Sequence, residues 1–104
     1  MIPVVENIHQ KVLEAVQKEG AFDMGDWIND SPCGTTYCRG GAAILAAGEA
    51  GLNLKDQTSF EFAAMAIYYE SSPITVSPVR FYESNEKALA DIKRCAEEES
   101  KQAK

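Results

Sequence analysis

The chain has 104 residues, 45% hydrophobic and 25% charged, a composition typical of one folded globular domain and not of a disordered segment. Its 16 acidic and 10 basic residues give a net charge of −6, which argues against direct binding to nucleic acid or to an anionic membrane. The N-terminal residues contain no basic segment followed by a long apolar run, and the longest stretch without polar side chains, 40–48, is too short for a bilayer, so we expect neither a secretory signal nor a membrane span.

The first expected element is an amphipathic helix over residues 3–19. Pro3 suits a first helical turn, apolar residues recur at spacings of three and four as far as Val16, and Gly20 marks the end. Residues 20–36 are rich in Gly, Asp, Ser, Thr and Pro and predict a loop. We expect one short helical turn near 24–29 within this loop, capped by Asp23, with Trp27 holding the loop to the core.

Residues 37–50 predict a second helix, apolar on every side, as is typical of a buried helix. Its Gly and Ala residues would let neighbouring helices approach closely, and Gly51 would form a left-handed cap. A third helix is expected over 59–70, opened by a capping box of Thr58 and Glu61. This helix has four aromatic residues, Phe60, Phe62, Tyr68 and Tyr69. The favoured interpretation is that they pack in the core, and the alternative is that they form an exposed contact patch.

Two prolines and the alternation of Ile74 with Val76 predict an extended segment or a single edge strand near 74–82. A last helix starts at Ser84 or Asn85 and is expected to fray over about 98–104. The sequence therefore predicts a single, mainly α domain over residues 1–104. We expect a compact bundle of about four helices with a buried, Gly/Ala-rich central helix.

The stretch most suggestive of chemistry is 33–43, "CGTTYCRGGAA". The favoured interpretation is a structural junction in which Thr35 or Thr36 caps the buried helix, Gly34 permits the turn into it and Cys38 packs in its first turn. A reactive thiol is the first alternative, because Cys38 would lie at a helix N-terminus beside Arg39.

Further alternatives for this stretch have weaker sequence support. One is a disulfide between Cys33 and Cys38. Another is a metal site formed by Cys33, Cys38, Cys95 and His9, but their spacing is not that of paired zinc knuckles. Gly-Thr-Thr before a helix could bind an anion, although the lysine of a P-loop is missing. We therefore predict no catalytic residue, no cofactor and no metal.

A second set of candidate residues would contact a partner. Asp23, Asp26 and Asp30 form an acidic loop around Trp27 that lacks the order of a calcium-binding loop. Arg80 and Tyr82 could anchor a partner or pin their own segment to the helices.

Two motifs carry a resemblance to a known group of proteins. Asp23, Met24 and Trp27 form Asp-Met-x-x-Trp, and residues 33–41 form Cys-Gly-Thr-Thr-x-Cys-Arg-x-Gly. With these motifs the chain resembles a group of small bacterial and bacteriophage proteins of unassigned function. Gly40 stands where Ala is common in that group, and Ala42 where Trp is frequent, so we expect a bulkier neighbour against this helix. The resemblance implies a prophage or mobile-element setting and supplies no catalytic residue.

The expected function is that of a non-enzymatic acidic protein that binds another protein, or itself, in the cytoplasm of a bacterial host. The resemblance makes a host protein the expected partner, and one version is inhibition of a defence or nucleic-acid-handling protein through Asp23, Asp26 and Asp30. The alternatives are a thiol-based redox or metal-binding protein centred on Cys33 and Cys38, and a virion or assembly component.

Overall fold

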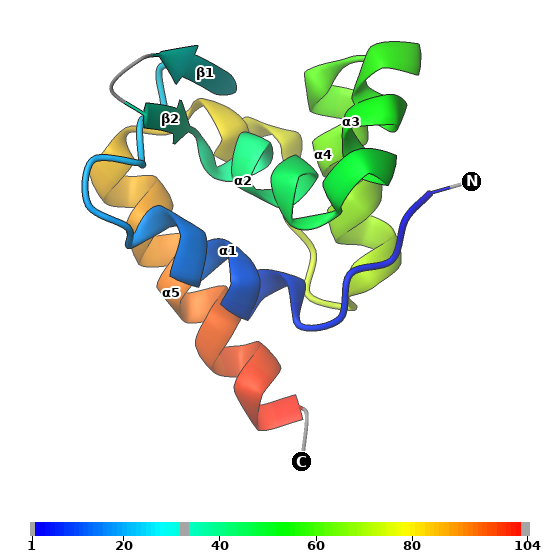
Figure 1. The fold of residues 1–104 in the computed structure, drawn as a ribbon. Helices are drawn as coiled ribbons and strands as arrows, with labels where there is room; N and C mark the ends of the chain where they lie inside the picture. The colour runs from blue at the N-terminus through cyan, green and yellow to red at the C-terminus, as the bar shows by residue number, and fades with distance from the viewer. Residues whose placement is uncertain (1, 32–33, 103–104) are drawn as a thin grey trace.

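The computed structural model describes residues 2–31 and 34–102 and is mainly helical, with one small sheet (Figure 1). Its elements in chain order are α1 (Ile8–Val16), β1 (Ile28–Ser31), β2 (Gly34–Tyr37), α2 (Arg39–Ala46), α3 (Gly48–Gln57), α4 (Phe60–Ser71), the 3₁₀ helix η1 (Pro78–Tyr82) and α5 (Asn85–Gln102). The prediction of a mainly α bundle is confirmed. Within the described ranges, no helix combines the length and the apolar character needed to cross a bilayer.

Helix α2 is the centre of the fold, as its sequence predicts. It packs against α1, α3 and α4, and its residues from Arg39 to Ile44 are all buried. The small residues are required, because a Cβ on Gly41 would overlap the carbonyl oxygen of Trp27 and a Cβ on Gly40 would overlap the Trp27 ring. The neighbour that lies against Gly40 is the Trp27 ring.

The prediction of a short helical turn near 24–29 is wrong, because these residues lead into and begin an antiparallel hairpin. β1 pairs with β2 in a register that places Ile28 opposite Tyr37 and Asn29 opposite Thr36. Asp23 makes a tight turn instead of capping a helix, since its carboxylate accepts a hydrogen bond from the Gly25 N–H at 2.8 Å. A strand pair depends on a partner segment, which the local pattern of one strand does not show.

The predicted helix cap at Thr35 or Thr36 is also wrong. Both threonines lie in β2, and α2 begins only at Arg39. The cap is Cys38, whose Sγ accepts a hydrogen bond from the Gly41 N–H at 3.4 Å. Pairing with β1 keeps the threonines in extended backbone, and the helix starts at Arg39, two residues later than predicted.

The predicted helix over 37–50 is divided into α2 and α3 at Gly48, which has a left-handed φ of 66°. Gly51, predicted as the left-handed cap, instead lies buried inside α3, which continues to Gln57. The next helix, α4, is capped by Ser59, whose hydroxyl accepts from the Phe62 N–H at 3.1 Å. Thr58 is not the predicted capping residue, because its hydroxyl donates to the Leu54 carbonyl at 2.6 Å.

The start of the first helix and the segment 74–82 also differ from expectation. α1 begins at Ile8 and not at Pro3, after Asn7 in a left-handed conformation with φ of 57°. Residues 73–77 are irregular and residues 78–82 form η1, so the described part of segment 74–82 is not a strand.

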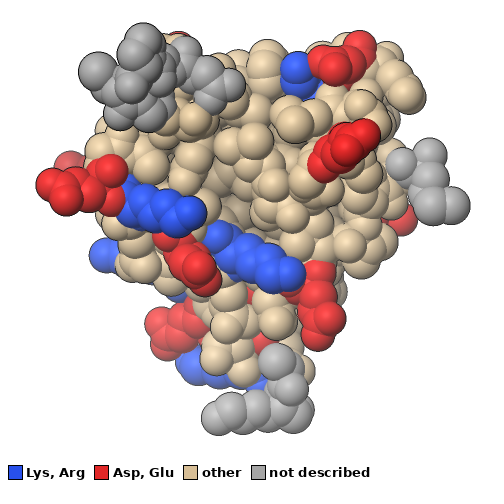
Figure 2. Space-filling view, viewed as in Figure 1, with Lys and Arg blue, Asp and Glu red and all other residues tan. Residues whose placement is uncertain are grey.

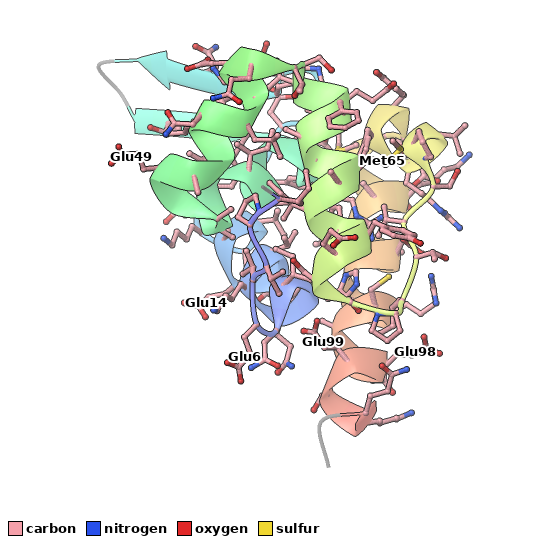
Figure 3. All side chains as sticks on the ribbon, turned by 90° about the vertical axis from the view of Figure 1, so that its right-hand side faces the viewer. Glu6, Glu14, Glu49, Met65, Glu98 and Glu99 are labelled. Atoms are coloured by element: carbon pink, nitrogen blue, oxygen red, sulfur yellow. The ribbon has the colours of Figure 1, made fainter. Side chains whose placement is uncertain are left out.

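Helix α5 begins at Asn85, as predicted, with the Ser84 hydroxyl accepting from the Lys87 N–H at 3.3 Å. It remains helical to Gln102, where fraying was expected from about residue 98. The reason is Glu99, which is buried and accepts hydrogen bonds from the N–H groups of His9 and Gln10 at 3.1 and 2.9 Å. Glu99 therefore caps the start of α1 from the far end of α5 (Figure 3).

Candidate functional site

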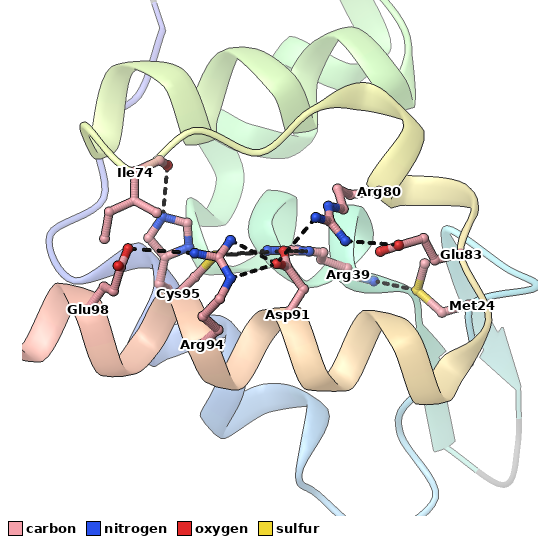
Figure 4. Close-up of polar contacts among 10 residues, drawn as sticks. Met24, Arg39, Ile74, Arg80, Glu83, Asp91, Arg94, Cys95 and Glu98 are labelled. Carbon is pink, nitrogen blue, oxygen red and sulfur yellow. Dashed lines mark hydrogen bonds and ion pairs between the residues drawn. The ribbon is translucent and has the colours of Figure 1, made fainter.

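The Cys-Arg-Gly part of the sequence motif leads into a buried polar cluster. Arg39, Asp91 and Cys95 of this cluster are drawn in Figure 4, and Tyr68 is its fourth member. Arg39 is the first residue of α2 and its side chain is 0% exposed. Its Nη1 donates to Oδ2 of Asp91 on α5 at 2.6 Å, and its Nη2 lies 3.5 Å from the Cys95 Sγ. The cluster therefore joins the central helix to α5 through a buried ion pair.

Asp91 is the residue on which three arginines converge. Besides Arg39, Arg94 donates to Oδ1 through Nε at 3.1 Å and Nη2 at 2.8 Å, and Arg80 Nη2 lies 3.8 Å from the same oxygen. Burial acts to raise the pKa of Asp91, but hydrogen bonds from Arg39 and Arg94 outweigh it and lower that pKa to about 2. Asp91 is therefore a charged carboxylate at neutral pH, and both of its oxygens accept hydrogen bonds from arginines.

Tyr68 covers the cluster from the side of α4. Its ring centroid lies 5.6 Å from the Arg39 guanidinium carbon, and the His9 ring stacks on it with centroids 5.3 Å apart. Burial raises the pKa of Tyr68 to about 12, against the opposing effect of Arg39. Burial also lowers the pKa of His9, so the imidazole is neutral at pH 7, and its Nε2 lies 3.2 Å from the Ile74 carbonyl oxygen. Within the described part of the chain, the Tyr68 hydroxyl and Arg39 Nε have no hydrogen-bond partner.

The described thiols lie where a reactive cysteine is disfavoured. Cys38 and Cys95 are both free and buried, and burial is the main cause that raises the pKa of each thiol. A nucleophilic cysteine needs the opposite shift together with access to its substrate. Cys33, the other half of the predicted thiol site, lies outside the described residues, as does any pairing it makes.

The cluster is arranged to hold elements together. Its charged groups are hydrogen-bonded to one another, Arg39 is sealed from solvent, and the described residues contain no group of three or more His, Cys, Asp or Glu placed to hold a metal ion. A buried ion pair fixes the relative position of the two elements that carry it. If the two side chains separated while still buried, each charge would lose its partner without gaining contact with water, which is unfavourable. We assign the cluster a structural role.

The residues predicted to contact a partner differ in exposure, and the structure brings two of them, Trp27 and Tyr82, into contact. Asp23 and Asp26 are exposed beside the hairpin, and the Asn29 amide lies 3.4 Å from the Asp26 carboxylate. Asp30 lies in β1, and its side chain is outside what the structure describes. Trp27 is half-buried and stacks on Phe60 of α4 with centroids 5.6 Å apart.

Arg80 and Tyr82, the other two predicted contact residues, differ from each other. Arg80 is engaged in an ion pair with Glu83 at 3.0 Å besides its contact with Asp91, so it pins its own segment to α5. Tyr82 is 64% exposed, and its ring lies at 90° to the Trp27 ring with centroids 6.1 Å apart. Its hydroxyl donates to the Glu61 carboxylate at 2.6 Å, which joins η1 to α4.

The exposed contact patch, which the sequence offered only as the alternative for the aromatic residues of α4, corresponds in part to an apolar area on α4 and η1, which we call the α4–η1 face. Tyr69 is 73% exposed, Val79 70% and Phe62 44%. With about 3.6 residues per turn, positions 62, 65, 66 and 69 lie on one side of α4, opposite the buried Ala63, Ala64 and Ile67. Met65 lies on the side of α4 that faces η1 (Figure 3). The members of the α4–η1 face are Phe62, Met65, Ala66, Tyr69, Val79 and Tyr82.

One signal in the sequence could have identified this face. α4 is apolar around its whole circumference, which normally means that a helix is covered on all sides. A chain with only a few other helices cannot cover every side of both α2 and α4. Since α2 takes the central place, one side of α4 is left open.

The opposite side of the molecule offers a shallow hollow between α1 and α2, with a volume of about 460 Å³ (Figure 2). Charged residues of both signs from α1 line one side, and apolar residues of α2 line the other. The hollow is lined by Lys11, Glu14, Ala15, Lys18, Tyr37, Ala42, Leu45 and Ala46. The Tyr37 hydroxyl is already used, because it donates to the Ala15 carbonyl at 2.8 Å. We see no set of catalytic groups converging there.

Comparison with known proteins adds no family to these observations. A scan against protein-family models finds no match, and neither the curated proteins nor the solved structures contain a significant match to this chain. The resemblance carried by the Asp-Met-x-x-Trp and Cys-Gly-Thr-Thr-x-Cys-Arg-x-Gly motifs therefore stays a prediction.

Proposed function

We propose that this chain is a non-enzymatic protein-binding module that uses the α4–η1 face to dock on a protein. The observation that carries the proposal is the open side of α4, where large apolar side chains at Phe62 and Tyr69 are exposed although the same helix buries its other side. Contiguous exposed apolar surface with aromatic residues is typical of protein–protein contact sites.

One end of the face adjoins a set of packed aromatic rings. Trp27 stacks on Phe60, meets Phe81 edge-on at 5.6 Å between centroids and contacts Tyr82, so Tyr82 is already held in place at that end. Binding to such a preorganised surface loses little conformational entropy, because the backbone and several side chains are already held in place. Covering the exposed apolar groups would add about 25 cal/mol for each Å² removed from water.

The polar cluster supports the non-enzymatic part of the proposal. Its most chemically suggestive groups, Arg39, Tyr68 and Cys95, are almost completely buried and face one another. A substrate would have to open the core to reach them. The exposed surface is therefore the part of the molecule that can meet another molecule.

The experiment is site-specific photo-crosslinking. A photoreactive amino acid replaces Tyr69 in one variant and Glu97 in the matched control, since both positions are exposed on a helix and Glu97 lies on α5, away from α4. In extracts of the native cells we expect a defined cross-linked protein species at position 69 and none at position 97. Equal labelling at both positions, or no protein adduct at positions 62, 69 and 79, would contradict the proposal.

A further inference from the structure

Resting on the proposed function, we further infer that the protein bound at the α4–η1 face presents an amphipathic helix whose apolar stripe is flanked by lysine and arginine. Three features support this partner: the shape of the face, the charges at its borders and the cost of placing a second copy of the chain there.

The shape of the face fits a helix. Phe62 and Tyr69 are two turns apart on α4, so the exposed stripe is about 10 Å long and follows the helix axis. Side chains spaced by three, four and seven residues form the ridges into which another helix packs its own side chains. η1 extends this surface sideways with Val79 and Tyr82, which widens the area that a partner helix would cover.

The charges at the borders of the stripe are all negative. Glu61 and Glu70 lie on opposite sides of the stripe around the helix, and both are exposed. No lysine or arginine occurs between residues 56 and 79. The cations on either side of that stretch are both in ion pairs, Lys55 with Asp56 at 2.6 Å and Arg80 with Glu83 at 3.0 Å. Glu61 already accepts a hydrogen bond from the Tyr82 hydroxyl at 2.6 Å, but this neutral donor leaves its negative charge uncompensated. Both glutamates can therefore pair with cations of a partner.

A second copy of the chain fits this face less well. Two copies facing each other would bring Glu61 and Glu70 against the same carboxylates of the other copy, and each chain already carries a net charge of −6. Like charges placed against one another oppose association, whereas a helix with basic flanks would meet both glutamates favourably.

The test uses two synthetic helical peptides with an identical apolar stripe, one with lysine and the other with glutamate at every flanking position. We expect the full chain to bind the lysine-flanked peptide at least about tenfold more tightly in a titration followed by fluorescence anisotropy. Phe62→Ser together with Tyr69→Ser should remove this binding. Glu61→Lys together with Glu70→Lys should reverse the preference, so that the glutamate-flanked peptide binds more tightly.

The matched control is Glu14→Lys together with Glu97→Lys, which changes the net charge equally but on exposed positions of α1 and α5. This control should keep the preference for the lysine-flanked peptide, which separates a local effect of the two glutamates from general attraction to an acidic protein.

The inference is overturned if both peptides bind equally, if neither binds, or if the preference survives in the Glu61→Lys/Glu70→Lys variant. It is also overturned if light scattering shows that the chain alone dimerises through this face. In each of these cases, a protein cross-linked at Tyr69 would leave the proposed function standing, whereas the absence of any such adduct would end both.

Discussion

Tyr68 and Tyr69 are neighbours on α4 and belong to two contrasting regions. Tyr68 is 1% exposed and covers a buried cluster of charged residues, while Tyr69 is 73% exposed on an apolar surface. Globular proteins usually bury apolar side chains and expose charged ones. Here paired charges are buried and aromatic side chains are exposed. Under the proposed function, the buried cluster stabilises the fold and the α4–η1 face is the docking surface, so substitutions in the two regions should have separable effects.

The largest expected effect comes from breaking the buried ion pair. Asp91→Ala leaves Arg39 as an unpaired buried charge and should lower the free energy of unfolding by about 3–5 kcal/mol. Urea denaturation measures this change. Replacing both partners, with Arg39→Met and Asp91→Leu, should restore most of the loss, since no unpaired charge then remains.

The control for that substitution is Glu97→Ala, which removes one partner of an exposed ion pair with Lys101 and should change stability by at most about 1 kcal/mol. If Asp91→Ala proved as mild as this control, the cluster would not be the stabilising centre described above.

The next effect concerns the close approach of the hairpin to α2. Gly41→Ala should destabilise the protein by about 3 kcal/mol, because the new Cβ would overlap the Trp27 carbonyl oxygen, which accepts a hydrogen bond from the Cys38 N–H at 3.3 Å. Thermal or urea unfolding measures the change. Gly25→Ala is the comparison, since its Cβ would meet only the end of the Asp23 side chain, and a cost below about 1 kcal/mol is expected. Equal costs at both positions would argue against this close approach.

The cluster also predicts a specific dependence of stability on pH. The pKa of Asp91 is lowered in the folded chain from 3.8 to about 2, so its contribution is complete above about pH 4 and is lost as the pH falls toward 2. The stability advantage of the unaltered chain over Asp91→Asn should shrink by about 2 kcal/mol across that interval. Urea denaturation of both chains at pH 2, 3, 4 and 6 provides the measurement. An advantage that did not change with pH would mean that Asp91 is not held as a carboxylate.

The exposed face should behave in the opposite way. Phe62→Ser with Tyr69→Ser should lower the free energy of unfolding by no more than about 2 kcal/mol, well below the loss for Asp91→Ala, because Tyr69 is 73% exposed and Phe62, at 44% exposed, is only partly packed. The same pair of changes should abolish peptide binding and should also abolish cross-linking from a photoreactive residue at position 79. A strongly destabilised double variant would mean that the face is part of the core and not a docking surface.

The smallest effect is expected at Tyr68→Phe. The Tyr68 hydroxyl is buried and has no hydrogen-bond partner within the described residues, so its removal should leave stability unchanged within about 0.5 kcal/mol or raise it slightly. Unfolding of Tyr68→Phe beside the unaltered chain tests this directly. A loss of more than about 1 kcal/mol would show that the hydroxyl takes part in the cluster after all.

The helical class of the fold and the central position of α2 could be predicted from the sequence, because a run of Gly and Ala that is apolar on every side has few other stable environments. The start of α5 was predictable for a local reason as well, since Ser84 caps it from the adjacent position. The hairpin was not predictable in this way, because β1 is stabilised by pairing with β2 and not by its own pattern.

The two regions of interest were hidden for a related reason. The partner of Arg39 is Asp91, which is 52 residues away, and nothing around either residue indicates the pairing. The periodicity of α4 shows that all its sides are apolar but cannot show which side α2 covers. The Arg39–Asp91 pairing and the choice of which side of α4 is covered both depend on tertiary packing. The sequence pattern alone therefore could not decide whether the aromatic residues of α4 belong to the core or to the surface.

Glu99 has a consequence for how the chain folds during its synthesis. α1 has no capping side chain of its own, and its free N–H groups at His9 and Gln10 bind a carboxylate made about 90 residues later. During synthesis, α1 therefore leaves the ribosome long before Glu99, whose carboxylate caps the start of this helix, has been added to the chain. We expect α1 to remain frayed at its start on nascent chains that stop before Glu99, and to become protected from amide exchange only when α5 has docked.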